Sequence, residues 1–357
     1  MIKALDLWLP AYLRRQRPVA TEGVVDLLLC VCDHFEPLHH ADKRIALERI
    51  QRWKKEFPKL IEPFLDADGV RPRHTFFYPV EQYDRDIVGE LSELCAACGG
   101  EVELHLHHDN DTEDGLRQKL EEGKADLARH NLLARSKTGE VCYGFIHGNW
   151  ALDNSHPEGR FCGVSNELDI LRETGCYADF TMPSAPDPSQ TRIINSIYYA
   201  QDKAKPKSHD AGVLAMVGNA VSNNSLLLVQ GPLGLNWSRR KFGLLPKIEN
   251  GEITGVNPPR PDRMKIWRNL GIQVQGQPNW IFIKLHTHGG IPQNMKTLLD
   301  DPMRRFYEHL REEYVENKNY RLHFVTAREL TNIIHSAEDG NSGDAGKFRD
   351  YRYLSAN

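Results

Sequence analysis

Histidines at the ends of apolar segments are the residues of this sequence with the clearest potential for chemistry. The chain has 16 histidines. Between residues 101 and 107 the odd-numbered residues are polar and the even-numbered residues are apolar, so His105 and His107 would share one face of a strand. In the segment 280–286, Phe282, Lys284 and His286 would share one face, and the three residues between and before them, Ile281, Ile283 and Leu285, would share the other. If the two strands are parallel, their terminal histidines would meet at one edge of a sheet.

The first long apolar segment also ends in polar residues, because Asp33 and His34 follow residues 24–32. Enzymes with parallel strands place their chemistry at the carboxyl ends of those strands. Neutral imidazoles and carboxylates together suit Zn²⁺ or a similar divalent ion. The sequence therefore predicts a metal site among the residues at the strand ends, which are His34, His105, His107, Asp109 and His286.

The composition is that of a globular protein with no large excess of either charge. The 357 residues include 45 lysines and arginines against 49 acidic residues, a net charge of −4, so no surface for nucleic acid is expected. The apolar run 24–32 is far shorter than the roughly 20 residues of a membrane-spanning helix. The first residues lack the order of a secretion signal, and the seven cysteines have no disulfide-framework spacing. We expect a cytoplasmic protein.

Segments with the period of a strand and segments with the period of a helix alternate along most of the chain. This alternation indicates βαβ units and a parallel sheet, and six or seven units favour a closed or nearly closed α/β barrel. No glycine-rich phosphate-binding loop follows the first strand, which argues against a dinucleotide-binding or P-loop protein. Strands are expected at 24–33, 73–79, 101–107, 141–147, 280–286 and 320–325, and helices at 42–55, 84–97, 113–131, 166–174, 301–316 and 327–335.

Three parts of the chain depart from this alternation. The interval 186–276 reads as a β-containing insertion in a barrel that spans residues 21–336, and the polar residues 337–357 read as a loosely held tail. Residues 1–20 contain an amphipathic helix, which either packs on the domain body or makes peripheral membrane contact through residues 2–17. The apolar face of this helix consists of Leu5, Trp8, Leu9, Tyr12 and Leu13.

At these residues the chain resembles the polysaccharide deacetylase (NodB-homology) family, a metal-dependent group with an irregular (β/α)7 barrel. The resemblance covers residues 24–185 and 278–335. Asp33-His34 stands at the position of the family's Asp-Asp pair, and His74-Thr75-Phe76-Phe77 matches its Ala-Thr-Phe-Phe strand. Gly100–His105 matches the strand that carries a metal-binding histidine. Ile283–His286 matches the late strand that ends in leucine and histidine.

The resemblance implies a role for each matching residue. Asp33 would be the catalytic base and His286 the general acid. The family's arginine-proline motif is replaced here by residues 147–153, and the order of carboxylate and histidine at the metal positions is exchanged. The metal, expected to be Zn²⁺, would be held by His34, His105 and Asp109, with His107 as the alternative to Asp109.

The activity implied is hydrolytic removal of an acetyl or related acyl group from a carbohydrate-like substrate. In a cytoplasmic protein this substrate would be a nucleotide- or lipid-linked sugar, reached at the inner face of the membrane. The alternatives are a glycoside hydrolase that pairs Asp33 or Glu36 with Asp153, and a catalytically inactive carbohydrate-binding homologue. The residues expected to contact the substrate are His147, Asn149, Trp150, Asp153 and His288.

Strand alternation also makes a prediction about a lysine. Lys284 lies two residues before His286 and should therefore point into the barrel, one layer below the site. A buried ammonium group is costly unless it is paired. We expect Lys284 to pair with Glu103 or with a neighbouring inward-facing acid.

Overall fold

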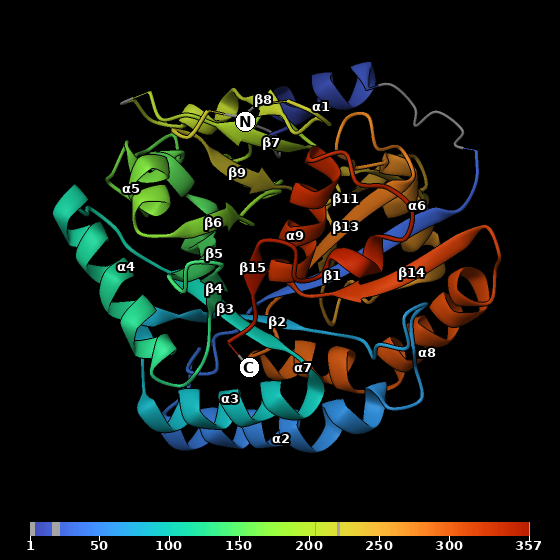
Figure 1. Ribbon diagram of the computed structural model, residues 1–357, viewed down its shortest axis with the longest axis horizontal. Helices are drawn as coiled ribbons and strands as arrows, with labels where there is room; N and C mark the ends of the chain where they lie inside the picture. The colour runs from blue at the N-terminus through green and yellow to red at the C-terminus, as the bar shows by residue number, and fades with distance from the viewer. Residues whose placement is uncertain (1–3, 16–21, 204, 220–221, 357) are drawn as a thin grey trace.

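The computed structural model describes residues 4–15, 22–203, 205–219 and 222–356, and a curled, mainly parallel sheet forms its centre (Figure 1). The path of hydrogen-bonded neighbours is β12-β13-β1-β2-β3-β5-β6-β9-β7-β8. The strands are β1 (Val25–His34), β2 (Thr75–Pro79), β3 (Glu101–Leu106), β4 (Ala134–Ser136), β5 (Val141–His147), β6 (Cys176–Asp179), β7 (Ile197–Ala200), β8 (Val213–Leu214), β9 (Leu226–Val229), β10 (Gly234–Lys241), β11 (Leu245–Glu249), β12 (Glu252–Ile253), β13 (Trp280–Thr287), β14 (Tyr320–Val325) and β15 (Tyr353–Leu354).

The predicted α/β class is confirmed, whereas closure into a barrel stays a prediction. β1 runs parallel to β13 along one edge, and along its other edge it pairs first with β14 and then with β2. Among the described residues, the strand pairs run from β12 to β8 without joining these two ends.

Helices cover the convex face of the sheet, and one helix fills its concave face. The odd-numbered β1 residues Leu27 and Leu29 belong to an apolar core shared with α2, α3, α4, α7 and α8. The even-numbered Leu28, Cys30 and Cys32 pack with α9, which lies at the centre of the molecule in Figure 1. The helices are α1 (Leu5–Arg14), α2 (Lys43–Ile61), α3 (Arg85–Cys98), α4 (Glu113–Ala128), α5 (Glu167–Glu173), α6 (Pro261–Leu270), α7 (Pro292–Leu299), α8 (Asp301–Leu310) and α9 (Ala327–Glu338).

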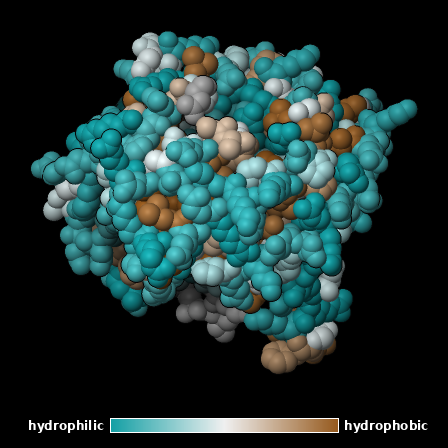
Figure 2. All heavy atoms as spheres, turned by 90° about the horizontal axis from the view of Figure 1, so that it is seen from below, coloured by the Kyte–Doolittle hydropathy of each residue, from teal (hydrophilic) through white to brown (hydrophobic). Residues whose placement is uncertain are grey.

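Helices α2 and α3 form the side of the molecule that Figure 2 shows, and this side is mainly hydrophilic with small hydrophobic patches. Their buried stripes include Trp53 and Leu91. Their outer faces are joined by the ammonium group of Lys54, which lies 2.6 Å from the carboxylates of both Glu90 and Glu93. The amphipathic period in the sequence therefore corresponds to one face on the sheet and one in water.

The interval 186–276 contributes strands to both ends of the central sheet. β9 pairs parallel with β6, and β7 and β8 continue that end of the sheet by antiparallel pairing. At the other end β12 runs parallel to β13. The hairpin β10–β11 is a separate two-stranded sheet. This interval is therefore integrated into the sheet rather than attached to its outside.

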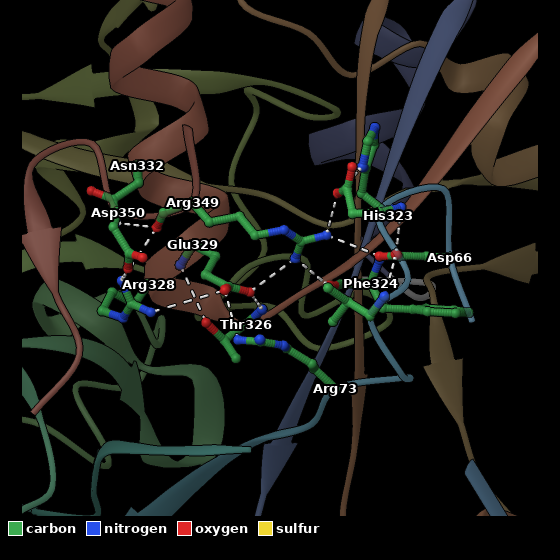
Figure 3. A network of polar contacts seen from close by, with 12 residues as sticks. Asp66, Arg73, His323, Phe324, Thr326, Arg328, Glu329, Asn332, Arg349 and Asp350 are labelled. Carbon is green, nitrogen blue, oxygen red and sulfur yellow. Dashed lines mark hydrogen bonds and ion pairs between the residues drawn. The ribbon is translucent and has the colours of Figure 1, made fainter. Parts of the chain in front are cut away.

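The expectation of a loosely held tail over 337–357 is wrong for the described residues up to 356. The Arg349 guanidinium donates to the backbone carbonyl of Phe324 at 2.6 Å and to the carboxylate of Asp66 at 2.9 Å (Figure 3). It also lies 3.2 Å from the carboxylate of Glu329 on α9. β15 then pairs with β4. Polar composition suggested mobility, but these buried ionic contacts hold the tail against the body.

The N-terminal helix α1 packs against the body through its predicted apolar face. Trp8 and Tyr12 are buried in a small core that includes Ala185 and Leu233, while Leu13 is 71% exposed. Membrane contact through residues 2–17 stays a prediction, and residues 2, 3, 16 and 17 lie outside the described part of the chain. Within the described part, every helix is too short or too polar to span a membrane.

Candidate metal centre and adjoining pocket

Two histidines and a glutamate meet at the carboxyl ends of β1 and β3, which lie on either side of β2 in the sheet. His34 ends β1 and His105 lies near the end of β3, and their ring centroids are 5.1 Å apart. Glu36, two residues beyond β1, places a carboxylate oxygen 3.3 Å from Nε2 of His105. One ligand atom from each of the three residues lies within 4.8 Å of the others. This grouping has the size and the donor types of a metal-binding centre.

The orientation of His105 is fixed by the next strand of the sheet. Its Nδ1 donates a hydrogen bond to the backbone carbonyl of Ile146 on β5 at 2.9 Å. Because a carbonyl only accepts, Nδ1 carries a proton, and Nε2 faces the Glu36 carboxylate. A backbone carbonyl that orients the outer nitrogen is a common second partner of metal-binding histidines.

Three further histidines surround this group. Nε2 of His107 lies 3.6 Å from the Glu36 carboxylate, while its Nδ1 lies 2.7 Å from a carboxylate oxygen of Glu81. The ring of His288 is 4.7 Å from that of His34, and the ring of His286 is 6.2 Å from it. The predicted meeting of histidines from β1, β3 and β13 is therefore present in the structure.

Burial and mutual contact set the charges in this cluster. Burial, and then the neighbouring His288, hold the pKa of His34 well below its usual value, and burial followed by Lys284 does the same for the pKa of His286. Burial would raise the pKa of Glu36, but the hydrogen bond and charge of His105 lower it to about 2. His34 and His286 are therefore neutral and Glu36 is ionised near neutral pH, which are the protonation states that bind a metal.

Two of the residues proposed from the sequence point elsewhere. Asp33 lies on the convex side of β1, where its carboxylate is 2.8 Å from Nε2 of His74 and accepts the N–H of Gly289 at 2.5 Å. Asp109 is exposed, and its carboxylate accepts the N–H of Phe161 at 2.7 Å. Glu36, which the sequence argument considered only for a glycoside hydrolase, stands beside the histidines instead. Its position two residues after His34 on the same chain is the signal that could have identified it.

A hollow of about 370 Å³ adjoins the cluster on the side of His286. Nδ1 of His286 has no hydrogen-bond partner among the described residues, and neither does the indole nitrogen of Trp150. Other residues that line the hollow are Pro183, Ser184, Ala185, Asp187, Asn250 and Glu252. Burial raises the pKa of Glu252. The hollow thus combines an aromatic face with a histidine and a carboxyl group.

The other residues expected to contact substrate lie in different surroundings. Asn149 is exposed with a left-handed backbone, at φ 53°. The Asp153 carboxylate accepts the N–H of Ser208 at 2.5 Å, and burial raises its pKa to about 8. His147 is buried in a second group of possible ligands, with His108 and others, that lies away from the hollow.

Lys284 is buried on the concave face, as strand alternation predicted, but its expected partner is wrong. Its ammonium group donates to the backbone carbonyls of Phe180 at 2.5 Å and Met182 at 2.7 Å. Glu103 instead accepts hydrogen bonds from the Tyr177 hydroxyl and from the N–H of Gly144. Burial lowers the pKa of Lys284 and raises that of Glu103.

Comparison with known proteins adds little to this geometry. No protein-family model matches the chain, and no curated protein matches it. A solved structure from Mycobacterium smegmatis, provisionally assigned as a polysaccharide deacetylase, is similar at 14% sequence identity and a TM-score of 0.45, over 90% of this chain and 95% of that chain. A similarity of this size bears on neither the activity nor the site.

Proposed function

We propose that this protein is a metal-dependent hydrolase that removes an acetyl or related acyl group from a carbohydrate-like substrate. The observation that carries the proposal is the cluster of His34, Glu36 and His105 at the carboxyl ends of β1 and β3, beside a hollow that contains His286. The family resemblance of the strand motifs is consistent with this activity. The proposed carboxylate ligand is Glu36 in place of Asp109, a choice supported by the 3.3 Å between a Glu36 oxygen and Nε2 of His105.

The donor set suits a catalytic divalent ion. Two imidazole nitrogens and one carboxylate are the protein ligands of many hydrolytic zinc centres, which leave a fourth position for water or substrate. Zn²⁺ bound by these residues would supply Lewis-acid activation of the acyl carbonyl and of the attacking water. The Ile146 carbonyl would hold His105 in the required tautomer through the 2.9 Å hydrogen bond of Nδ1.

His286 is the proposed proton carrier. The residue lines the hollow and its Nδ1 has no hydrogen-bond partner among the described residues, so the imidazole would accept the proton of the attacking water and return it to the departing amine or alcohol. Asp33 is not assigned this role, because both its carboxylate oxygens are engaged on the convex side of β1. Trp150 offers an apolar face on which a sugar ring can stack.

The setting of the substrate is part of the same proposal. A nucleotide- or lipid-linked sugar at the inner face of the cytoplasmic membrane is the proposed substrate class. The glycoside hydrolase alternative has less support, because the Asp33 carboxylate faces away from the hollow and Asp153 is bound to the backbone of Ser208.

The test is acetate release from a panel of acetylated amino sugars, together with the metal content of each variant. His105→Ala and Glu36→Gln should lose both the metal of this centre and turnover. His286→Gln should keep the metal and lose turnover by about 10²–10⁴-fold. Asp109→Asn is the matched control and should keep both properties. Full metal content and turnover in His105→Ala and Glu36→Gln would contradict the proposal.

A further inference from the structure

A second group of four buried side chains lies outside the proposed active centre. His108 follows β3, His147 ends β5, Cys162 lies in the loop that follows, and Glu167 is the first residue of α5. All four are buried, and one ligand atom from each lies within 4.8 Å of the others. We propose that these residues form a closed structural site for Zn²⁺.

One contact within the group, between His147 and Glu167, lacks a donor. His147 Nδ1 donates to the Gly148 carbonyl at 2.5 Å, which leaves the lone pair of Nε2 facing the Glu167 carboxylate at 3.6 Å. Nε2 of His147 has no hydrogen-bond partner among the described residues. A lone pair that faces a buried carboxylate is unfavourable, and a cation between the two would satisfy both.

The sulfur of Cys162 is prepared for a metal by backbone donors. Its Sγ accepts the N–H groups of Asn154 at 3.3 Å and Val164 at 3.4 Å, and it lies 3.5 Å from the Glu167 carboxylate. Burial raises the pKa of the Cys162 thiol, so without a metal its S–H can donate to the Glu167 carboxylate. A bound metal would displace this proton, because cysteine binds metals as the thiolate, and the two N–H groups would stabilise that thiolate.

The donor chemistry selects the ion. Two imidazole nitrogens, one thiolate and one carboxylate give four ligands, the number that structural zinc sites use in tetrahedral geometry. Mg²⁺ and Ca²⁺ prefer oxygen ligands and would not use the cysteine. The complete burial of all four residues leaves no open position for a substrate, so the role is structural rather than catalytic.

The position of the group shows what the ion would hold together. Its ligands join the ends of β3 and β5 to the start of α5 and to the loop between them. That loop contains Trp150, which lines the hollow, and several residues with left-handed backbone, which a cross-link would help to keep in place. A metal here would fix the loop without contacting the substrate. This inference does not depend on the proposed activity.

Two measurements on the purified protein test the site. Elemental analysis should give two equivalents of zinc, one for each centre, and Cys162→Ser should lose one of them. Replacement of zinc by Co²⁺ should produce a near-ultraviolet thiolate-to-cobalt absorption band that Cys162→Ser abolishes. Cys142→Ser removes another buried cysteine and is the matched control, which should keep both the band and the metal.

Different variants test the two metal centres, so failure of this inference can be distinguished from failure of the proposed function. His105→Ala should keep the cobalt–thiolate band whatever the fate of the catalytic proposal, and it should lose one equivalent of metal if the first centre binds metal as proposed. A cobalt-loaded wild-type protein with no such band, or Cys162→Ser with the full metal content, would overturn the inference. If Cys162→Ser does not fold, X-ray absorption of the wild-type zinc protein decides, because a sulfur neighbour at about 2.3 Å is expected.

Discussion

At the scale of single residues, strand alternation correctly predicted which face of the sheet a side chain lies on, but not which groups it contacts. The alternation in β13 correctly places Lys284 and His286 on the concave face, because that property follows from backbone geometry alone. The partner of Lys284 depends on where β6 ends, which no pattern in β13 records. Two carbonyls that follow β6 satisfy the ammonium group, and Glu103 is satisfied by Tyr177 and Gly144.

The contacts of Lys284 lead to a prediction about stability. Lys284→Met keeps the length of the side chain and removes the donor to two buried carbonyls, those of Phe180 and Met182. Each buried acceptor left without a donor costs roughly 1–3 kcal/mol, partly offset here because no buried charge remains. We expect the free energy of unfolding to fall by about 1–3 kcal/mol, measured by urea denaturation.

A matched variant on the surface separates this effect from the loss of a lysine as such. Lys296 on α7 is exposed, so Lys296→Met should change the free energy of unfolding by less than about 0.5 kcal/mol. Equal stability of Lys284→Met and the parent would show that the two carbonyls do not need this donor.

At the scale of elements, the sequence predicted the βα units at 24–147 and 280–335 because each carries a clear period and end signals. Asp42, Asp84 and Thr326 accept backbone N–H groups at the starts of α2, α3 and α9, as residues of those types do at helix N-termini. β12 was predicted only as part of the β-containing interval 186–276, because a strand of two residues has no period of its own.

The candidate sites show a similar limit. His34 and His105 could be predicted to meet because each lies at the carboxyl end of a strand that the pattern assigns to one parallel sheet. Glu36 could not be predicted to join them, because it lies just beyond a strand. Cys162 in a loop and Glu167 at the start of α5 could not be predicted to meet His108, because only tertiary structure fixes the course of the loop before α5. Sequence spacing therefore predicted the strand-borne ligands and missed the loop-borne ones.

Two helical glycines give a prediction at this scale, because their surroundings differ. A Cβ on Gly123 of α4 would lie 2.6 Å from the Cβ of Val80 and within 2.8 Å of both its methyl carbons, whereas a Cβ on Gly89 of α3 would meet nothing within 4 Å. Alanine gains up to about 1 kcal/mol over glycine within a helix. Gly89→Ala should therefore raise the free energy of unfolding by roughly 0.5–1 kcal/mol.

Gly123→Ala should lower the free energy of unfolding despite the same gain in helix propensity. Overpacking of this kind costs roughly 1–3 kcal/mol, and Val80 is held between α4 and the strand β2 that precedes it. Thermal and urea denaturation of the two variants and the parent measure the sign of each change in the free energy of unfolding. A rise in the free energy of unfolding in both variants would mean that the contact with Val80 is relieved without cost.

At the scale of the whole molecule, a buried ionic network joins parts of the chain that are far apart in sequence. Arg349 in the C-terminal segment contacts Asp66, Asp68 and Glu329, and His323 of β14 lies between the carboxylates of Asp26 and Asp68 (Figure 3). The network therefore links β1, the loop after α2, β14, α9 and the tail. Its integrity should depend on pH through His323.

The charge on His323 is favoured in the folded protein. Its Nε2 lies 2.7 Å from Asp26 and its Nδ1 2.8 Å from Asp68, so both nitrogens carry protons that face carboxylates. Burial opposes the charged form, but the hydrogen bonds with Asp26 and Asp68 outweigh it and raise the pKa of His323 to about 9. An unfolded chain would have a histidine pKa of about 6.5.

This difference sets the sign of the pH dependence. Because the folded pKa is the higher one, the stabilisation is fully present below about pH 6.5 and is lost as the pH rises through about 9. The shift corresponds to at most about 3 kcal/mol. We expect the free energy of unfolding, measured by urea denaturation, to fall between about pH 6 and pH 10 by a larger amount in the parent than in His323→Gln. His40→Gln, which removes an exposed histidine, should retain the parent's pH dependence. Identical slopes for the parent and His323→Gln would mean that His323 is neutral in the folded protein.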